Sequence, residues 1–180
     1  MLVVSKFIDR VSSAIAHYVS YLLPAMMLLV GAVVLLRYMF NSGSILLQES
    51  VTYLHALVFM LGIPYTLSQD EHVRVDILYT RCSQHTRNWI NLTGHLIFLM
   101  PLSVTIVIYS WQYTLNSWSV LEGSAEVGGV PAVFLLKSLI PFTAILLFTQ
   151  GLSEIVKCIR ALRTKKAPDP LKAPDPLKAP

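Results

Sequence analysis

Apolar residues follow one another along this chain in four long stretches, and polar residues lie mostly in the intervals between them. The stretches run over residues 14–36, 45–68, 89–111 and 132–158. The hydrocarbon core of a bilayer requires roughly 20 mostly apolar residues of helix, and each stretch reaches that length. Inside lipid a helix satisfies its own backbone groups, and the chain lacks the alternating strands typical of a membrane barrel. The pattern predicts an all-α integral membrane protein with four transmembrane helices.

The Lys and Arg residues predict the orientation of these helices. Basic residues precede the first stretch, lie between the second and third, and follow the fourth: Lys6, Arg10, Arg74, Arg81, Arg87, Lys157, Arg160, Arg163, Lys165, Lys166, Lys172 and Lys178. The interval 37–44 carries only Arg37, and the interval 112–131 carries two acids, Glu122 and Glu126, and no base. Cytoplasmic loops retain Lys and Arg, so we expect both termini in the cytoplasm. The net charge of +4 follows from this bias and requires no nucleic acid; the basic run near the C-terminus suits anionic lipid head groups.

The composition agrees with a single membrane domain. Apolar residues make up 54% of the chain and charged residues 13%, about half of the charged share of soluble domains. We therefore predict a four-helix membrane domain over residues 1–163. Residues 164–180 repeat Ala-Pro-Asp-Pro-Leu-Lys, and this proline spacing predicts a disordered tail. The first stretch is too long for a cleaved signal peptide and lacks a cleavage site, so we expect it to be retained.

The interval between the second and third stretches is longer than a simple turn. Asp76 is placed to cap a short helix that would lie at the cytoplasmic interface. Ile77, Leu78, Cys82, His85 and Trp89 would share one side of that helix. An irregular loop is the alternative. The two cysteines, Cys82 and Cys158, have the spacing of neither a metal site nor a redox motif, and we interpret them as reduced thiols.

Each stretch contains one internal proline: Pro24, Pro64, Pro101 and Pro141. A proline removes one helical hydrogen bond, which membrane helices tolerate when a neighbouring helix satisfies the freed carbonyl. We interpret these prolines as packing features rather than hinges.

Three ionisable residues lie near the predicted periplasmic side, namely Arg37, Glu49 and Lys137. A charge at the centre of a bilayer costs roughly 2.5–3.5 kcal/mol, so each of them suggests a partner. We expect Glu49 to pair with Arg37, with Lys137 or with a partner protein. A substrate pathway would place polar groups near mid-membrane on several helices, so the pattern favours structural pairing.

Histidines raise a different class of function. His17 and His95 lie at similar depth, and His55 lies nearer the middle of the second stretch. Two histidines that face each other across a bundle can ligate a haem, so a cytochrome-type membrane anchor is one alternative. A stand-alone small channel or transporter is another. The chain shows no nucleophile–base arrangement, phosphate loop or metal-ligand cluster, so we predict no enzyme activity, no cofactor and no metal.

Several motifs, taken together, resemble a known family. The first group is Arg37-Tyr38-Met39-Phe40-Asn41, Leu47-Gln48-Glu49-Ser50, Tyr53-Leu54-His55 and His72-Val73-Arg74-Val75-Asp76. The second is Glu122-Gly123-Ser124, Gly129-Val130-Pro131, Lys137-Ser138-Leu139-Ile140-Pro141 and Gln150-Gly151. Their order and spacing resemble the DctQ-like small permease of TRAP (tripartite ATP-independent periplasmic) transporters. One departure is that Leu46 and Leu47 stand where many relatives have a tryptophan ahead of Glu49.

The resemblance implies an accessory subunit in the inner membrane of a bacterium or archaeon. Its partners would be a large multispan elevator subunit and a periplasmic binding protein that delivers an organic acid, with sodium as the coupling ion. The small subunit would brace the scaffold. The family pattern falls on Arg37, Glu49, His72, Asp76 and Lys137, which we expect to serve assembly or structure. Glu122 and Glu126 are candidates for docking the binding protein.

Overall fold

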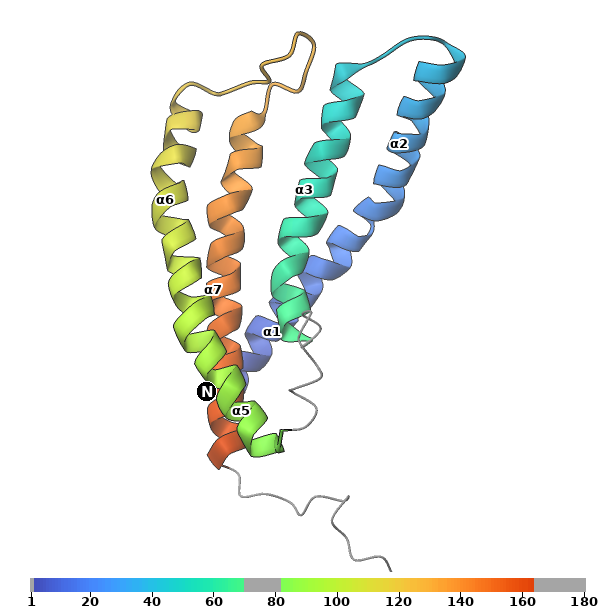
Figure 1. Cartoon of the computed structure of the whole chain (residues 1–180). Coiled ribbons are helices and arrows are strands. Elements are labelled where there is room, and N and C mark those ends of the chain that lie inside the picture. The colour runs from blue at the N-terminus through green and yellow to red at the C-terminus, as the bar shows by residue number, and fades with distance from the viewer. Residues whose placement is uncertain (1, 70–81, 164–180) are drawn as a thin grey trace, which may run out of the picture.

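The computed structural model describes residues 2–69 and 82–163, all in helices and short connections (Figure 1). The helices are α1 (Leu2–Ser20), α2 (Leu22–Met39), α3 (Ile45–Ser68), α5 (Gln84–Gly94), the π-helix η1 (His95–Leu99), α6 (Met100–Ser119) and α7 (Val133–Arg163). They form four rods long and apolar enough to cross a membrane: Val4–Met39, Ile45–Ser68, Gln84–Ser119 and Val133–Arg163. The prediction of an all-helical protein with four such helices is confirmed. The expected interfacial helix at Asp76, the candidate His72 and the tail over 164–180 lie outside the described residues.

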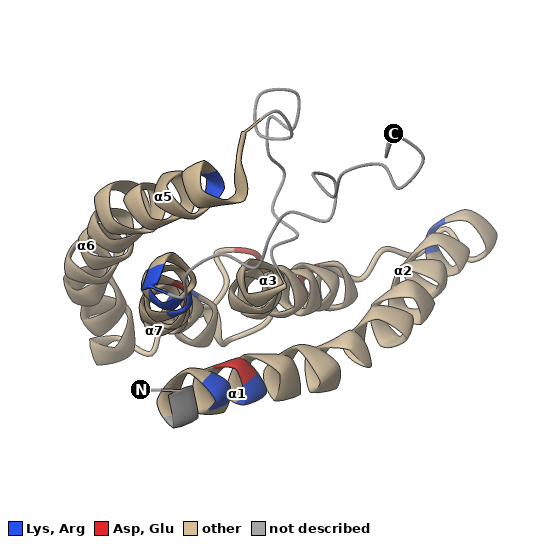
Figure 2. Ribbon diagram, turned by 90° about the horizontal axis from the view of Figure 1, so that it is seen from below, with Lys and Arg blue, Asp and Glu red and all other residues tan. Residues whose placement is uncertain are grey.

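Helix α7 lies at the centre of the arrangement. It packs against α1, α3, α5 and α6, and α3 in turn packs against α1 and α2. Seen along the helices, α1 and α2 run past one side of α3 and α7, while α5 and α6 lie on the other side of α7 (Figure 2). We call the end where the α2–α3 and α6–α7 connections lie the loop end, and the end where α1 begins and α7 finishes the terminal end. The two ends of the described chain therefore lie on the same side, and basic residues of α1, α5 and α7 gather there. The N-in/C-in orientation itself stays a prediction.

A proline breaks the first rod. Pro24 has no N–H and its ring crowds the carbonyl four residues earlier, which is that of Ser20. Helix α1 ends at Ser20, and Tyr21 donates its N–H to the carbonyl of Tyr18 at 3.3 Å before α2 begins. The predicted first span, residues 14–36, thus crosses this break, and its helix begins earlier, at Leu2.

A neighbouring helix satisfies the carbonyl that Pro141 frees in α7. That carbonyl belongs to Lys137, and the hydroxyl of Thr114 on α6 donates to it at 3.4 Å. This contact is the compensation that a membrane helix needs for an internal proline. It favours a packing role for Pro141.

Small and polar side chains fill the helix contacts, while large apolar ones point outward. Ser103, Gln150 and Ser153 are at most 1% exposed, whereas Leu28 and Phe98 are 71% and 72% exposed. Lipid is as apolar as leucine, so membrane helices associate through close packing and hydrogen bonds rather than by burying apolar surface. Gly151 marks one close approach, because a Cβ there would lie 2.8 Å from Leu99 of η1.

Candidate functional site

A carboxylate on α3 holds the α6–α7 connection at the loop end. The hydroxyl of Ser44 caps α3 by accepting from the N–H of Leu47 at 3.4 Å, and Glu49 follows in the second turn. One carboxylate oxygen of Glu49 accepts a hydrogen bond from the hydroxyl of Ser124. The other oxygen accepts from the backbone N–H of Val130 at 2.6 Å. We call Glu49, Ser124, Gly129 and Val130 the Glu49 clasp.

The backbone at the end of α6 turns the α6–α7 connection toward the carboxylate of Glu49. Leu121 adopts a left-handed conformation with φ of 46°, which lets the N–H of Glu122 bond to the carbonyl of Ser117 at 3.0 Å. Together with the bond from the N–H of Leu121 to the carbonyl of Trp118, at 3.2 Å, this makes a Schellman motif that closes the helix. The carbonyl of Glu122 then accepts from the N–H of Phe134 at 3.3 Å, so one residue links the end of α6 to the start of α7.

Gly129 is required by the close approach of the clasp. The N–H of Ser124 bonds to the carbonyl of Val130 at 3.2 Å and closes the neck of the connection. A Cβ on Gly129 would lie 2.6 Å from Oε2 of Glu49 and would also collide with the Ser124 hydroxyl. Only glycine leaves room for the carboxylate to reach both of its donors.

The expected pairing of Glu49 with Lys137 or Arg37 is not what the structure contains. Lys137 instead binds Glu122 at 2.5 Å, and its ammonium group lies 4.2 Å from the ring centre of Tyr113. The expectation matched charges by their depth alone, whereas the Schellman motif brings Glu122 to the start of α7. The hydrogen bond from Lys137 lowers the pKa of the Glu122 carboxyl below its ordinary value.

The other candidates at this end are exposed. Arg37, in the last turn of α2, forms no ion pair with another described residue. Of the two acids proposed for docking, Glu122 is engaged with Lys137, while Glu126 lies exposed at the tip of the connection beside Val127, which is 93% exposed. His72 and Asp76 fall outside the described residues.

A second polar contact joins α1 to α7 at the terminal end. The amide of Gln150 is fully buried, donating to Asp9 at 2.8 Å and accepting from the hydroxyl of Ser12 at 2.8 Å. Lys157 binds the Asp9 carboxylate at 2.9 Å. We call the set the terminal cluster, and its members are Ser5, Asp9, Ser12, Gln150, Ser153, Glu154 and Lys157.

The terminal cluster was not predicted as a site, although the sequence contains a signal for it. The α1 members recur at intervals of four and three residues, and the α7 members at intervals of three, one and three. Such spacing puts each set on one side of its helix. Two polar stripes at the same predicted depth indicate helices in contact.

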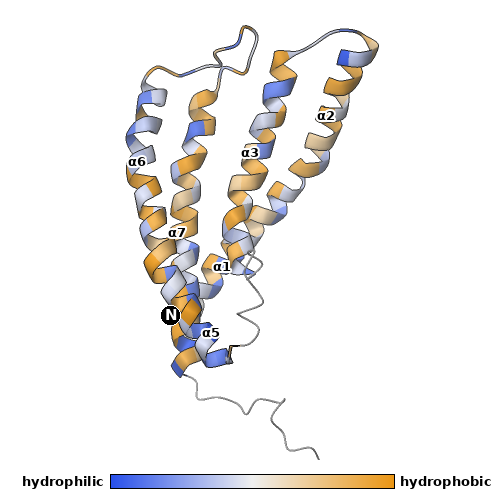
Figure 3. Ribbon diagram, in the orientation of Figure 1, coloured by the Kyte–Doolittle hydropathy of each residue, from blue (hydrophilic) through white to orange (hydrophobic). Residues whose placement is uncertain are grey.

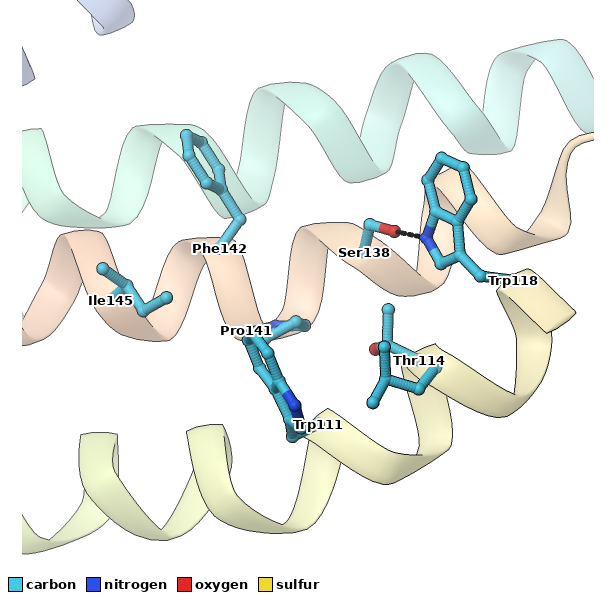
Figure 4. Close-up of a pocket in the computed structure, with 8 residues that line it drawn as sticks. Trp111, Thr114, Trp118, Ser138, Pro141, Phe142 and Ile145 are labelled. Carbon is cyan, nitrogen blue, oxygen red and sulfur yellow. Dashed lines mark hydrogen bonds between the residues drawn. The ribbon is translucent and has the colours of Figure 1, made fainter.

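An apolar groove of about 360 Å³ lies between α6 and α7 (Figure 4). The indole of Trp118 reaches across to α7 and donates to the hydroxyl of Ser138 at 2.7 Å, and Trp111 lies beside Pro141. The groove therefore offers a ligand no charged group. Its lining residues are Trp111, Thr114, Leu115, Trp118, Ser138, Pro141, Phe142 and Ile145.

The histidines of the haem alternative lie on separate helices. His17 is in the last turn of α1, 3.4 Å from the Tyr21 hydroxyl, His55 stacks on Phe59, and His95 opens η1. Within residues 2–69 and 82–163, no group of three or more His, Cys, Asp or Glu side chains is placed to hold a metal ion.

Comparison with known proteins matches residues 26–161 to the family described as "Tripartite ATP-independent periplasmic transporters, DctQ component". A relative from Vibrio cholerae serotype O1, the C4-dicarboxylate TRAP transporter small permease protein DctQ, is 24% identical over 110 residues. The aligned part covers 61% of this chain and 46% of that relative, so the chain spans about half of the relative's length. No solved structure matches the chain. The family match covers most of the chain, including both residues of the Lys137–Glu122 pair and every member of the Glu49 clasp, so the chain belongs to the DctQ family, the small permease component of TRAP transporters.

Proposed function

We propose that this chain is the accessory small permease subunit of an ion-coupled TRAP transporter for organic acids, and that it braces the scaffold of a large elevator subunit. The observation that carries the proposal is that two half-buried acidic side chains are bound within the chain. The carboxylates of Glu49 and Asp9 are held by donors of the chain itself, at opposite ends of the structure. Charged groups held in this way support the structure, and within residues 2–69 and 82–163 they form no series of open charged sites along which a solute would pass.

The two contacts suit a brace because they fasten the central helix at two separate heights. The connection held by the Glu49 clasp enters α7 at Val133, 17 residues before Gln150, which corresponds to about 25 Å along an α-helix. The Glu49 clasp ties α3 to the connection that begins α7, and the terminal cluster ties α1 to the last turns of α7. A helix held at two heights resists tilting relative to its neighbours. An elevator that moves its substrate site across the membrane requires such a stationary wall.

The substrate class and the partners follow from the family. The Vibrio cholerae relative is named for C4-dicarboxylates, in keeping with an organic acid as the substrate. The partners would be the large multispan subunit and a periplasmic binding protein. We place the docking of the binding protein at Glu126 rather than at Glu122, because only Glu126 is exposed without an ion-pair partner among the described residues.

Co-purification tests the bracing role. The chain is expressed with its large membrane partner, and pull-down and substrate uptake are measured for the wild type, Glu49→Ala and Ser50→Ala. Ser50 is the matched control because its hydroxyl bonds to the carbonyl of Leu46 within its own helix. We expect Glu49→Ala to reduce both readouts and Ser50→Ala to reduce neither. Wild-type assembly and uptake in Glu49→Ala would remove the Glu49 clasp from the mechanism.

Reconstitution tests whether the chain conducts solute. Vesicles that contain this chain alone should remain tight to organic acids and to sodium. Solute-selective flux through such vesicles would overturn the brace and establish a stand-alone transporter.

Docking is tested by reversing the charge at the tip of the connection. Glu126→Lys should raise the concentration of binding protein that gives half-maximal uptake. Ser42→Lys adds a positive charge at the other connection of the loop end, and this control should leave that concentration unchanged. Unaltered transport kinetics in Glu126→Lys would refute the docking role.

A further inference from the structure

Helix α3 presents a polar stripe on its outer side. Gln48, Thr52, His55, Phe59 and Gly62 follow one another at intervals of four, three, four and three residues, a spacing that places them on one side of an α-helix. Thr52 and His55 are exposed, and Phe59 is 62% exposed. We call these five residues the α3 stripe. Figure 3 shows the hydrophilic bands that interrupt the apolar surface of α3 in the half nearer the loop end.

His55 is the member whose position requires an explanation. It lies ten residues after Ile45, the first residue of α3, about 15 Å along the helix and therefore near the middle of a hydrocarbon core about 30 Å thick. Its ring stacks on Phe59 with 6.2 Å between the ring centres, and it makes no hydrogen bond to another described residue. A neutral imidazole carries one donor and one acceptor. Lipid chains can satisfy neither, so an exposed imidazole at this depth indicates a protein neighbour.

The outward faces of α2 and α7 differ from the α3 stripe in chemistry. The outer side of α2 exposes Met27, Leu28 and Leu35, which are 70%, 71% and 55% exposed. The outer side of α7 exposes Phe142 and Ile145, which are 49% and 43% exposed. Those faces present hydrocarbon to hydrocarbon and are suited to lipid.

Gly62 supports the same face on geometric grounds. A Cβ on Gly62 would meet nothing within 4 Å, so the packing of this chain does not require glycine there. A membrane helix without a side chain at one position lets another helix approach closely at that point. The α3 stripe therefore combines an open imidazole with a place for close backbone approach, about two helical turns apart.

We propose that the α3 stripe is the surface on which a membrane-spanning helix of the large subunit docks, with a hydrogen-bonding side chain of that helix opposite His55 and its backbone closest to Gly62. This inference rests on the proposed function and adds to it the face of the chain that meets the partner. Hydrogen-bond complementarity selects the occupant: lipid offers His55 no partner, and a helix with a polar side chain at matching depth does.

Photo-crosslinking in the intact complex tests the location. A photoreactive benzoylphenylalanine replaces Phe59 on the α3 stripe or, as the matched control, Phe142 on the apolar face of α7. Both positions are exposed phenylalanines of membrane-spanning helices. We expect a crosslink to the large subunit from position 59 and none from position 142. A crosslink to the large subunit from 142, with only lipid or a second copy of this chain captured from 59, would overturn the proposal.

Two glycine-to-leucine variants test whether a partner helix approaches closely at Gly62. They also distinguish failure of the docking face from failure of the proposed function. Gly62→Leu and Gly31→Leu each place a side chain where nothing lies within 4 Å in this chain, so each variant alone should unfold at the wild-type temperature. In co-expression, Gly62→Leu should lower recovery of the large subunit at least tenfold, while Gly31→Leu on α2 should retain it. Full recovery with Gly62→Leu, or loss with Gly31→Leu alone, would overturn the α3 stripe. Failure of the wild-type chain to co-purify would instead overturn the proposed function itself.

Discussion

Gly129→Ala is the smallest change that should open the Glu49 clasp. The added methyl group would lie 2.6 Å from Oε2 of Glu49, well inside van der Waals contact, so the carboxylate or the connection has to move. Either movement breaks the hydrogen bonds that Glu49 accepts from Ser124 and from the N–H of Val130. A hydrogen bond to a charged group contributes about 1.5–3 kcal/mol. The clasp is half-buried, and water replaces part of this energy, which leaves a cost of about 2 kcal/mol.

The assay is thermal unfolding of the purified chain in detergent, followed by tryptophan fluorescence. For a domain of this size, 2 kcal/mol corresponds to a fall in the unfolding midpoint of about 4–8 °C. Gly43→Ala is the control, because Gly43 lies in the other connection of the loop end and a Cβ there meets nothing within 4 Å. The double variant Glu49→Ala with Gly129→Ala should be scarcely less stable than Gly129→Ala, since each change alone removes both hydrogen bonds of the Glu49 carboxylate. Equal midpoints for Gly129→Ala and Gly43→Ala would refute the steric explanation.

Three further perturbations test the other contacts of α7. Thr114→Val removes the donor to the Lys137 carbonyl and should cost about 1 kcal/mol, seen as a lower unfolding midpoint than that of Thr105→Val on the exposed side of α6. Gln150→Leu leaves the buried hydroxyl of Ser12 without its acceptor and removes one donor from the half-buried Asp9 carboxylate, and it should cost about 2–4 kcal/mol; an unchanged midpoint would show that the cluster is not holding α1. Glu122 has a lowered pKa in the folded protein, so its bond to Lys137 stabilises fully above the ordinary pKa of glutamate and is lost as the pH falls through the folded pKa. The midpoints of the wild type and Glu122→Gln, measured from pH 7 down to about pH 2, should therefore converge at the acid end of the series, and a constant difference would contradict the assignment.

The sequence predicted the four helices because the length of an apolar run is a local property that a bilayer fixes. It also singled out Glu49, Lys137 and Glu122 as residues that need an explanation. The pairing among them could not be predicted in the same way. It depends on the left-handed backbone of Leu121, which turns the connection so that Glu122 meets α7 and Ser124 meets α3. Leucine is not a residue that marks such a turn, since glycine is the usual one there.

The sequence predicted part of the break between α1 and α2. Pro24 predicts a disturbance of the helix, but the position of the disturbance follows from the carbonyl that the ring crowds, four residues earlier. The sequence predicted that some neighbouring helix would satisfy the carbonyl freed by Pro141, but not that Thr114 of α6 would donate to it. No local feature of the sequence indicates which helix lies beside Pro141. Contacts between helices are the part of this fold that periodicity alone leaves open.

The positions of polar groups relative to the membrane connect these results. At the two ends of α7, polar side chains point inward and have partners in the chain, as in the Glu49 clasp and the terminal cluster. On α3, His55 lies at mid-span and points outward, with no hydrogen bond to a described residue. If the chain acted alone in lipid, stability would favour an apolar residue at that position, because hydrocarbon leaves the imidazole unsatisfied. Under the proposed function the opposite rule applies: the internal polar contacts would keep the subunit rigid, and the outward polar group would lie on the side where we propose that the partner docks.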